Sequence, residues 1–127
     1  MNRKHLVQRI ALYAMVTLYV LAGLNHFRVP EFYLRLMPPY IPEHQLMILL
    51  SGIAEFTLGI LLLFKRTRKL ASWGIIAMLL VFFSVHIYML QERHTVFADV
   101  PEVILWIRIP LQFVLIYWAY WVGKVRD

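Results

Sequence analysis

Four long apolar runs dominate the pattern of hydrophobic and polar positions along the chain. They cover approximately residues 6–27, 46–64, 70–90 and 103–121. About 20 apolar residues in a helix cross the roughly 30 Å of hydrocarbon in a bilayer, and each run is close to that length. The runs also lack the alternation of polar and apolar residues that a strand of a membrane barrel requires. The pattern therefore predicts an all-α protein with four transmembrane helices.

These runs leave little of the chain for anything else. We therefore expect residues 1–127 to form a single membrane domain without a separate soluble part. Short connections place consecutive helices side by side in antiparallel order, which predicts a four-helix bundle. The basic flank of the first run is similar to the start of a secretion signal, but the run is too long for one, and we expect it to be retained.

One connection, at 27–44, is longer than the others. After Pro30 its apolar residues recur at three- and four-residue spacing, which is typical of a helix. We predict a short helix over residues 31–37 on the outer membrane surface, ended by the proline-rich stretch MPPYIP (37–42). This helix is either an interfacial anchor, the role that we favour, or a lid over a pocket.

Composition and charge agree with a membrane protein. Hydrophobic residues make up 61% of the chain, and the mean hydropathy is +0.67. The net charge of +6 comes largely from the N-terminus, the segment KRTRK (65–69), Lys124 and Arg126, whereas the other two connections mix bases with acids. Because short loops rich in Lys and Arg stay in the cytoplasm, we predict that both termini and the 65–69 loop are cytoplasmic. The charge thus follows the membrane topology and requires no nucleic-acid partner.

Several kinds of chemistry lack their sequence signals. Cysteine is absent, which rules out disulfides and thiolate metal sites within the chain. The chain also contains no HExxH zinc motif, no GxSxG nucleophile elbow and no glycine loop of the phosphate-binding type. The sequence therefore predicts no metal site.

Strongly polar residues lie in the outer half of the predicted spans. Counting about 1.5 Å per residue from the outer end of each span puts them between the mouth and roughly 14 Å down. Intramembrane ionisable groups almost always face protein or a water-filled cavity, and each of these residues falls on a plausible inward stripe of its helix. We therefore expect six side chains from four helices to converge: Asn25, His26, Glu55, His86, Arg108 and Gln112.

Glu55 stands in an apolar run that has no other ionisable side chain. An isolated ionised carboxylate in an apolar medium is costly, so Glu55 requires a partner, water or a proton. Arg108 is a long, planar cation that can reach toward the same depth, and we predict a direct Glu55–Arg108 ion pair. The small residues Ser51, Gly52 and Gly59 would let a neighbouring helix approach beside Glu55.

Two interpretations of the polar set stay open. It is interhelical glue that fixes register, or it is a site that binds or shuttles something, which we favour. His86 taken alone is more typical of a structural histidine than of a ligand. His26 and His86 could also hold a haem between two helices, which the bulky segment FFSVHIY (82–88) disfavours.

Five segments together resemble the DoxX-like family of small four-helix membrane proteins. They are AGLNHFRVPEFY (22–33), MPPYIP (37–42), SGIAEFTLGILLLF (51–64), IYM (87–89) and RIPLQFVLIYWAYW (108–121). In that family an acid recurs in the second helix and Arg-x-Pro-x-Gln in the fourth, which match Glu55 and the run Arg108 to Gln112. The chain departs from the family at Ser84 and His86, where relatives more often have proline and asparagine.

The resemblance implies a redox-associated subunit in the bacterial cytoplasmic (inner) membrane. Our first hypothesis is an outer-leaflet pocket for a quinone-like or other small amphipathic ligand, with quinone as the one cofactor that the resemblance suggests. Glu55 would accept a proton and Arg108 would stabilise developing negative charge. Since the chain carries no redox thiol, electrons would pass through the quinone or a membrane or soluble redox partner. The residues expected to bind the ligand are Asn25, His26, His86 and Gln112.

Two other functions are weighed against this one, and whether the protein is an enzyme stays open. A non-enzymatic scaffold or assembly factor would dock on partner helices and use the polar set only for internal order. A small-solute transporter ranks last, because the first span has no acid and no interrupted helices recur in matched halves. Besides the lipid bilayer, a second copy of the chain is a further partner compatible with the sequence.

Overall fold

The computed structural model describes residues 3–28 and 30–125, and its regular elements are all α-helices. In chain order they are α1 (Arg3–Arg28), α2 (Pro30–Leu36), α3 (His44–Leu62), α4 (Arg68–Gln91) and α5 (Glu102–Val122). All except α2 are long and apolar enough to cross a membrane. The prediction of an all-α protein with four long apolar helices is therefore confirmed, and it fits an integral membrane protein.

The helix boundaries lie close to those read from the hydrophobic pattern. The short helix predicted at 31–37 is α2, which begins at Pro30 and ends at Leu36, just before the paired prolines. Proline is accommodated at the first helical position because the amide that it lacks has no intrahelical acceptor there. Arg126, which contributed to the charge pattern, lies outside the described residues.

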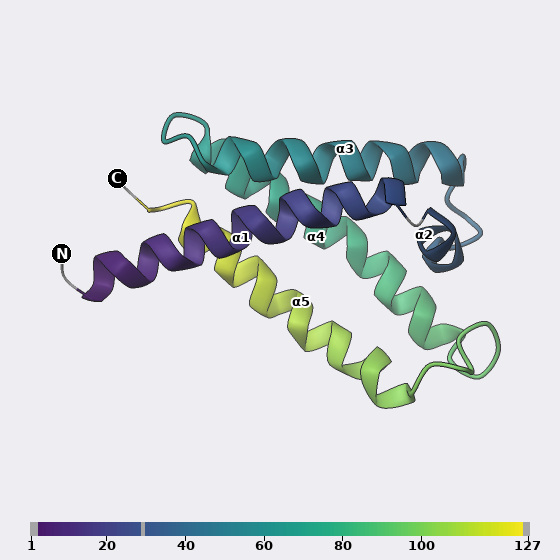
Figure 1. Ribbon diagram of the computed structural model, residues 1–127. Helices are drawn as coiled ribbons and strands as arrows, with labels where there is room; N and C mark the ends of the chain where they lie inside the picture. Colours follow the sequence, from purple (N-terminus) through teal and green to yellow (C-terminus); the bar gives the residue numbers. More distant parts are fainter. Residues whose placement is uncertain (1–2, 29, 126–127) are drawn as a thin grey trace.

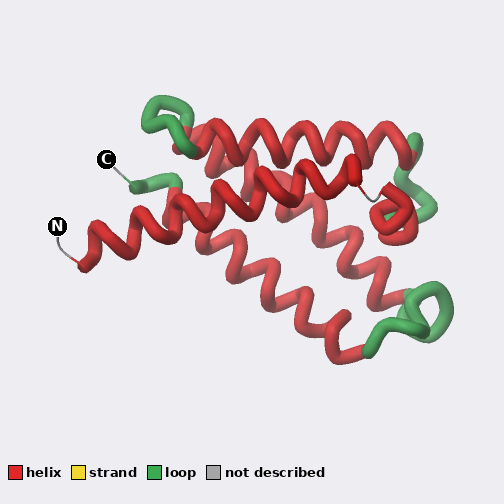
Figure 2. Tube along the Cα trace, viewed as in Figure 1, coloured by secondary structure: helices red, strands yellow, loops and turns green. Residues whose placement is uncertain are grey.

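The four long helices form two pairs. Helix α1 packs mainly on α3, and α4 packs mainly on α5, while contacts between the two pairs are fewer. Figure 1 shows that α4 and α5 run obliquely away from α1 and α3 toward the end that carries α2. The start of α1, the end of α5 and the 63–67 turn all lie at the opposite end, as the loops in Figure 2 make clear. The bundle is therefore closed at one end and divergent at the other.

The main hydrophobic core occupies the closed end. Met15, Leu62, Ile75 and Ala119 come from four different helices, and each is fully buried at 0% exposure. A second, smaller cluster of Met89, Phe97 and Leu105 joins α4, the 92–101 loop and α5 at the divergent end. Apolar packing thus holds α4 and α5 together at that end, while polar and apolar side chains share the space between the pairs.

Two glycines bring α1 and α3 into direct backbone contact. A Cβ atom placed on Gly23 would lie 2.6 Å from the amide nitrogen of Phe56 and 2.7 Å from the carbonyl oxygen of Gly52. A Cβ atom on Gly52 would lie 2.8 Å from the Cβ atom of His26. The expectation that small residues of the second span admit a close neighbour is confirmed, and that neighbour is α1.

Gly23→Ala should lower the free energy of unfolding by about 1–3 kcal/mol, because the new methyl group meets backbone atoms that move only if the two helices separate. Gly74→Ala in α4 is the matched control, since its Cβ atom would meet only the side chain of Leu58, which can rotate. The control should be neutral or slightly stabilising through helix propensity. Unfolding in mixed detergent micelles, followed by circular dichroism, measures both; equal losses would contradict the contact.

Candidate functional site

A cavity of about 180 Å³ lies between the diverging helix pairs, and all four long helices and α2 contribute to its wall. We call it the polar cavity. Its apolar lining includes Leu36, Ile48, Phe82 and Val85. The polar side chains in the lining are His26, Tyr33, Ser51, Glu55, His86 and Arg108.

Glu55 is buried against His26 on one wall of the polar cavity. Each residue is 6% exposed, and 3.3 Å separates Oε2 of Glu55 from Nδ1 of His26. The same nitrogen lies 3.0 Å from the carbonyl oxygen of Ala22, which takes its hydrogen bond. Within residues 3–28 and 30–125, Oε2 of Glu55 therefore lies beside the His26 ring but has no hydrogen-bond partner. A buried carboxylate oxygen in this state is ready to receive a donor from a ligand.

Local sequence explains why these two side chains meet. Gly23 lies three residues before His26, and Gly52 lies three residues before Glu55. Residues at this spacing share a helix face, so the close contact of the glycines carries the two polar side chains to the same seam. The Glu55–His26 contact is therefore a consequence of backbone packing.

A chain of hydrogen bonds forms the opposite wall. Nε of Arg108 donates to Nδ1 of His86 at 3.2 Å, which makes that ring nitrogen the acceptor. Nε2 of His86 then carries the proton and donates to Oε1 of Gln112 at 3.0 Å. Nε2 of Gln112 donates in turn to the carbonyl oxygen of Leu79 at 2.7 Å. In this series of hydrogen bonds, Nδ1 of His86 accepts and Nε2 donates. His86 is therefore held in one neutral tautomer.

The predicted direct pair between Glu55 and Arg108 is wrong. Both side chains line the polar cavity, but the described residues pair Glu55 with His26 and Arg108 with His86. The two predicted partners come from different helix pairs, which diverge at this end. Arg108 donates one of its five N–H groups to His86. Its side chain lines the same cavity as Glu55, and the remaining donors are available there.

The other predicted residues take two different positions. Gln112 is 3% exposed and stands behind His86, outside the cavity lining. Asn25 is also outside the lining, and its Nδ2 donates to the hydroxyl oxygen of Tyr33 at 2.9 Å. The ring of Tyr33 stacks on His26 with centroids 3.9 Å apart and planes 20° apart. Asn25 therefore acts on the cavity by holding Tyr33.

Two residues of the site were missed by the sequence analysis. Tyr33 was not among the six side chains expected to converge, yet it forms part of the cavity wall. The signal that could have found it is its place on the same face of the short helix as Leu36 and Met37, which also line the cavity. Gly23 was overlooked because small residues were sought only on the second span. Its spacing from His26 repeats that of Gly52 from Glu55.

Helix α2 is tied across the divergent end by Arg35. The guanidinium donates to the carbonyl oxygen of Val96 at 2.9 Å and forms an ion pair with Asp99. It also lies 5.2 Å from the centre of the Phe97 ring. These contacts join α2, next to the α1–α3 pair, to the loop of the α4–α5 pair. The lid alternative for the short helix gains support from this position, because α2 both lines and bridges the cavity.

A family model covers most of the chain. Residues 15–123 match the family model described as a domain of unknown function, DUF8561. The chain belongs to this family. No match was found among curated proteins or among solved structures. Every residue that lines the polar cavity of this DUF8561 chain falls within the matched range.

Among residues 3–28 and 30–125, no group of three or more His, Asp or Glu side chains is arranged to hold a metal ion. The paired positions of His26 with Glu55 and of His86 with Arg108 instead give the cavity an acidic wall and a basic wall.

A double-mutant cycle separates the observed pairing from the predicted one. We expect His26→Ala and Glu55→Ala to show a coupling energy of about 0.5–3 kcal/mol, since the two side chains are in contact. The cycle of Glu55→Ala with Arg108→Ala should give a smaller value. Unfolding in mixed micelles measures all five variants. A larger coupling for Glu55 with Arg108 would restore the direct pair.

The Arg35 tie should depend on pH. The Arg35 guanidinium lowers the pKa of Asp99 below its ordinary value of 3.8. A lowered pKa means that the ion pair stabilises the tie at neutral pH and is lost as the pH falls through the pKa of Asp99. Because the chain has no cysteine, spin labels can be attached at Glu31→Cys and His94→Cys. Their distance distribution should broaden when the pH is lowered from 7 to below the pKa of Asp99. Adding Arg35→Gln should give the broad distribution at both values; a narrow one would contradict the tie.

Proposed function

We propose that this protein is a redox-associated membrane subunit whose polar cavity holds the head group of a quinone-like amphipathic ligand. One observation carries the proposal. Oε2 of Glu55 is buried at the cavity and accepts no hydrogen bond within the described residues, although a cationic side chain, Arg108, lines the same space. A small ring with a hydroxyl donor on one edge and an oxygen acceptor on the opposite edge would satisfy both groups.

The size of the polar cavity supports a single six-membered ring. A buried apolar cavity of about 150 Å³ is known to accept benzene, and this one measures about 180 Å³. A porphyrin is far larger, which argues against a haem between His26 and His86. The lining combines six apolar residues with six polar ones, and polar groups set in an apolar wall fix the orientation of a small ring.

The residues suit proton exchange with such a head group. A bound quinone would supply two-electron, two-proton redox chemistry. Oε2 of Glu55 would accept a hydrogen bond from a hydroxyl group of the head group and take up its proton, with His26 at 3.3 Å beside the carboxylate. Glu55 would have to pass this proton on before it takes up the second one. Arg108 donates to the oxygen on the far edge and stabilises negative charge there. Electrons have to leave through a redox group on a membrane or soluble partner.

The topology predicted from the charges indicates on which side of the membrane the polar cavity would open. The polar cavity lies at the end away from the basic 65–69 loop. With that loop and both termini in the cytoplasm, the cavity would open in the outer leaflet of a bacterial inner membrane, and α2 would lie at the interface. The likeness to the DoxX-like family gains support from the acid of α3 and the Arg-x-Pro-x-Gln of α5, because Glu55 and Arg108 line one cavity.

A scaffold is the second candidate, and one observation favours it. Helix α5 is the least buried of the four long helices, with Phe113, Val114 and Tyr117 more than half exposed. That surface contacts either lipid or the helices of a partner. In a scaffold the polar cavity would serve internal order only.

Quinone content tests the proposal. Protein extracted from its native membrane in a mild detergent should retain about one quinone per chain, measured by solvent extraction and absorbance. Glu55→Gln and Arg108→Leu should each lower that content at least tenfold, on the scale of a lost charged hydrogen bond of roughly 1.5–3 kcal/mol. Both variants remove a group that faces the ring.

Matched controls are available on the same chain. Glu43→Gln and Arg66→Leu make the same chemical changes at exposed positions outside the polar cavity and should retain the quinone. If all variants and the parent protein contain no quinone above the level of bulk lipid, the binding proposal is wrong, and the scaffold takes its place.

A further inference from the structure

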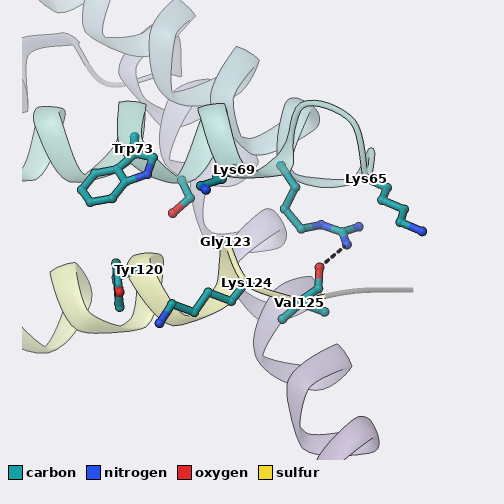
Figure 3. Close-up of a pocket in the computed structure, with 9 residues that line it drawn as sticks. Lys65, Lys69, Trp73, Tyr120, Gly123, Lys124 and Val125 are labelled. Carbon is teal, nitrogen blue, oxygen red and sulfur yellow. Dashed lines mark hydrogen bonds between the residues drawn. The ribbon is translucent and has the colours of Figure 1, made fainter.

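A second pocket, of about 670 Å³, lies at the closed end of the bundle. It is formed by the start of α4, the end of α5 and the turn before α4 (Figure 3). We call it the basic pocket, because its lining includes Lys65, Lys69 and Lys124. Figure 3 shows Trp73 of α4 and Tyr120 of α5 facing each other at one end of it, away from Lys65. The function proposed above makes no use of this pocket.

Positive charge collects here without acids in the same segments. Residues 65–73 and 117–125 contain no Asp or Glu. Lys65, Lys69 and Lys124 are exposed, and Nζ of Lys124 lies 4.2 Å from the centre of the Tyr120 ring. The pocket therefore attracts an anion. Its lysines are exposed and are not part of the packing between the helices.

The frame of the basic pocket is fixed by buried bonds. Arg68, at 2% exposure, donates to the carbonyl oxygens of Leu62, Leu63 and Val125. Oγ of Ser72 donates to the carbonyl oxygen of Ala119 at 2.7 Å, which joins α4 to α5. The hydrogen bonds of Arg68 and Ser72 thus hold the backbone segments that carry the three lysines.

The depth of the pocket points to a lipid. Trp73 and Tyr120 meet edge to face with ring centroids 5.9 Å apart, and Trp and Tyr gather at the head-group level of membranes. Beside them, Leu70 is 72% exposed and Tyr117 is 70% exposed. An occupant at this level meets cations on its aqueous side and apolar side chains on its hydrocarbon side. A free phosphate would contact only the cations.

We propose that the basic pocket binds the phosphate head group of an anionic glycerophospholipid, whose acyl chains run along α4 and α5. Lys65, Lys69 and Lys124 bind the phosphate, and the contacting rings of Trp73 and Tyr120 lie beside the glycerol region. Basic pockets between membrane helices bind anionic head groups in this way, and each basic residue near the head group strengthens binding roughly fivefold.

Competition between two lipids tests the proposal. Purified protein in mixed micelles is given phosphatidylglycerol and phosphatidylcholine at equal concentration, and native mass spectrometry counts the molecules bound. The parent protein should prefer phosphatidylglycerol by at least about tenfold, and the triple variant Lys65→Gln, Lys69→Gln, Lys124→Gln should lose that preference. Circular dichroism checks that the variant is folded, as expected for exposed positions.

The matched control removes the same charge elsewhere. Arg3→Gln, Lys4→Gln and Arg66→Gln together also remove three positive charges from this end, but none of these residues lines the pocket. The control should keep the preference. An equal loss in both triple variants would mean that general surface charge attracts the lipid, which overturns the site. Displacement of the lipid by inorganic phosphate, at an ionic strength matched with chloride, would overturn the lipid as its occupant.

Discussion

Where Gly23 meets Gly52, the backbones of α1 and α3 touch, and the position of the candidate site depends on that contact. Because neither residue has a side chain, the next turn of each helix brings His26 and Glu55 to the same seam. A larger residue at either position would separate the helices. It would leave the carboxylate of Glu55 without its neighbour in an apolar surrounding, which is strongly unfavourable.

The space between the helix pairs has a related cause. Apolar packing closes the bundle at the end of Met15 and Ile75, while the pairs diverge toward α2. A gap of that kind in a membrane protein is filled by lipid, by side chains or by a ligand. Here the wall of α4 and α5 is stiffened by the bonds from Arg108 to Gln112 through His86, and Arg35 connects the two sides at the mouth.

Much of the fold was predictable, because the length of an apolar run and the thickness of a bilayer determine a membrane helix almost alone. The convergence of Glu55 and Arg108 on one cavity was also predictable from depth and helix face. Their partners were not, since depth and face do not say which helices are neighbours. The contact of Gly23 with Gly52 makes α1 and α3 neighbours, and neither glycine alone indicates that contact. The position of α2 depended on Arg35 and the distant Asp99, which no local pattern connects.

The fixed tautomer of His86 makes the two walls of the cavity chemically different. Its Nδ1 is occupied by Arg108 and its Nε2 by Gln112, so this wall offers donors and has little capacity to take up a proton. The wall of His26 and Glu55 has the opposite character, since it presents an acceptor. The ligand proposed for this cavity would therefore bind in one orientation, and a proton that it releases would pass to the α1–α3 side.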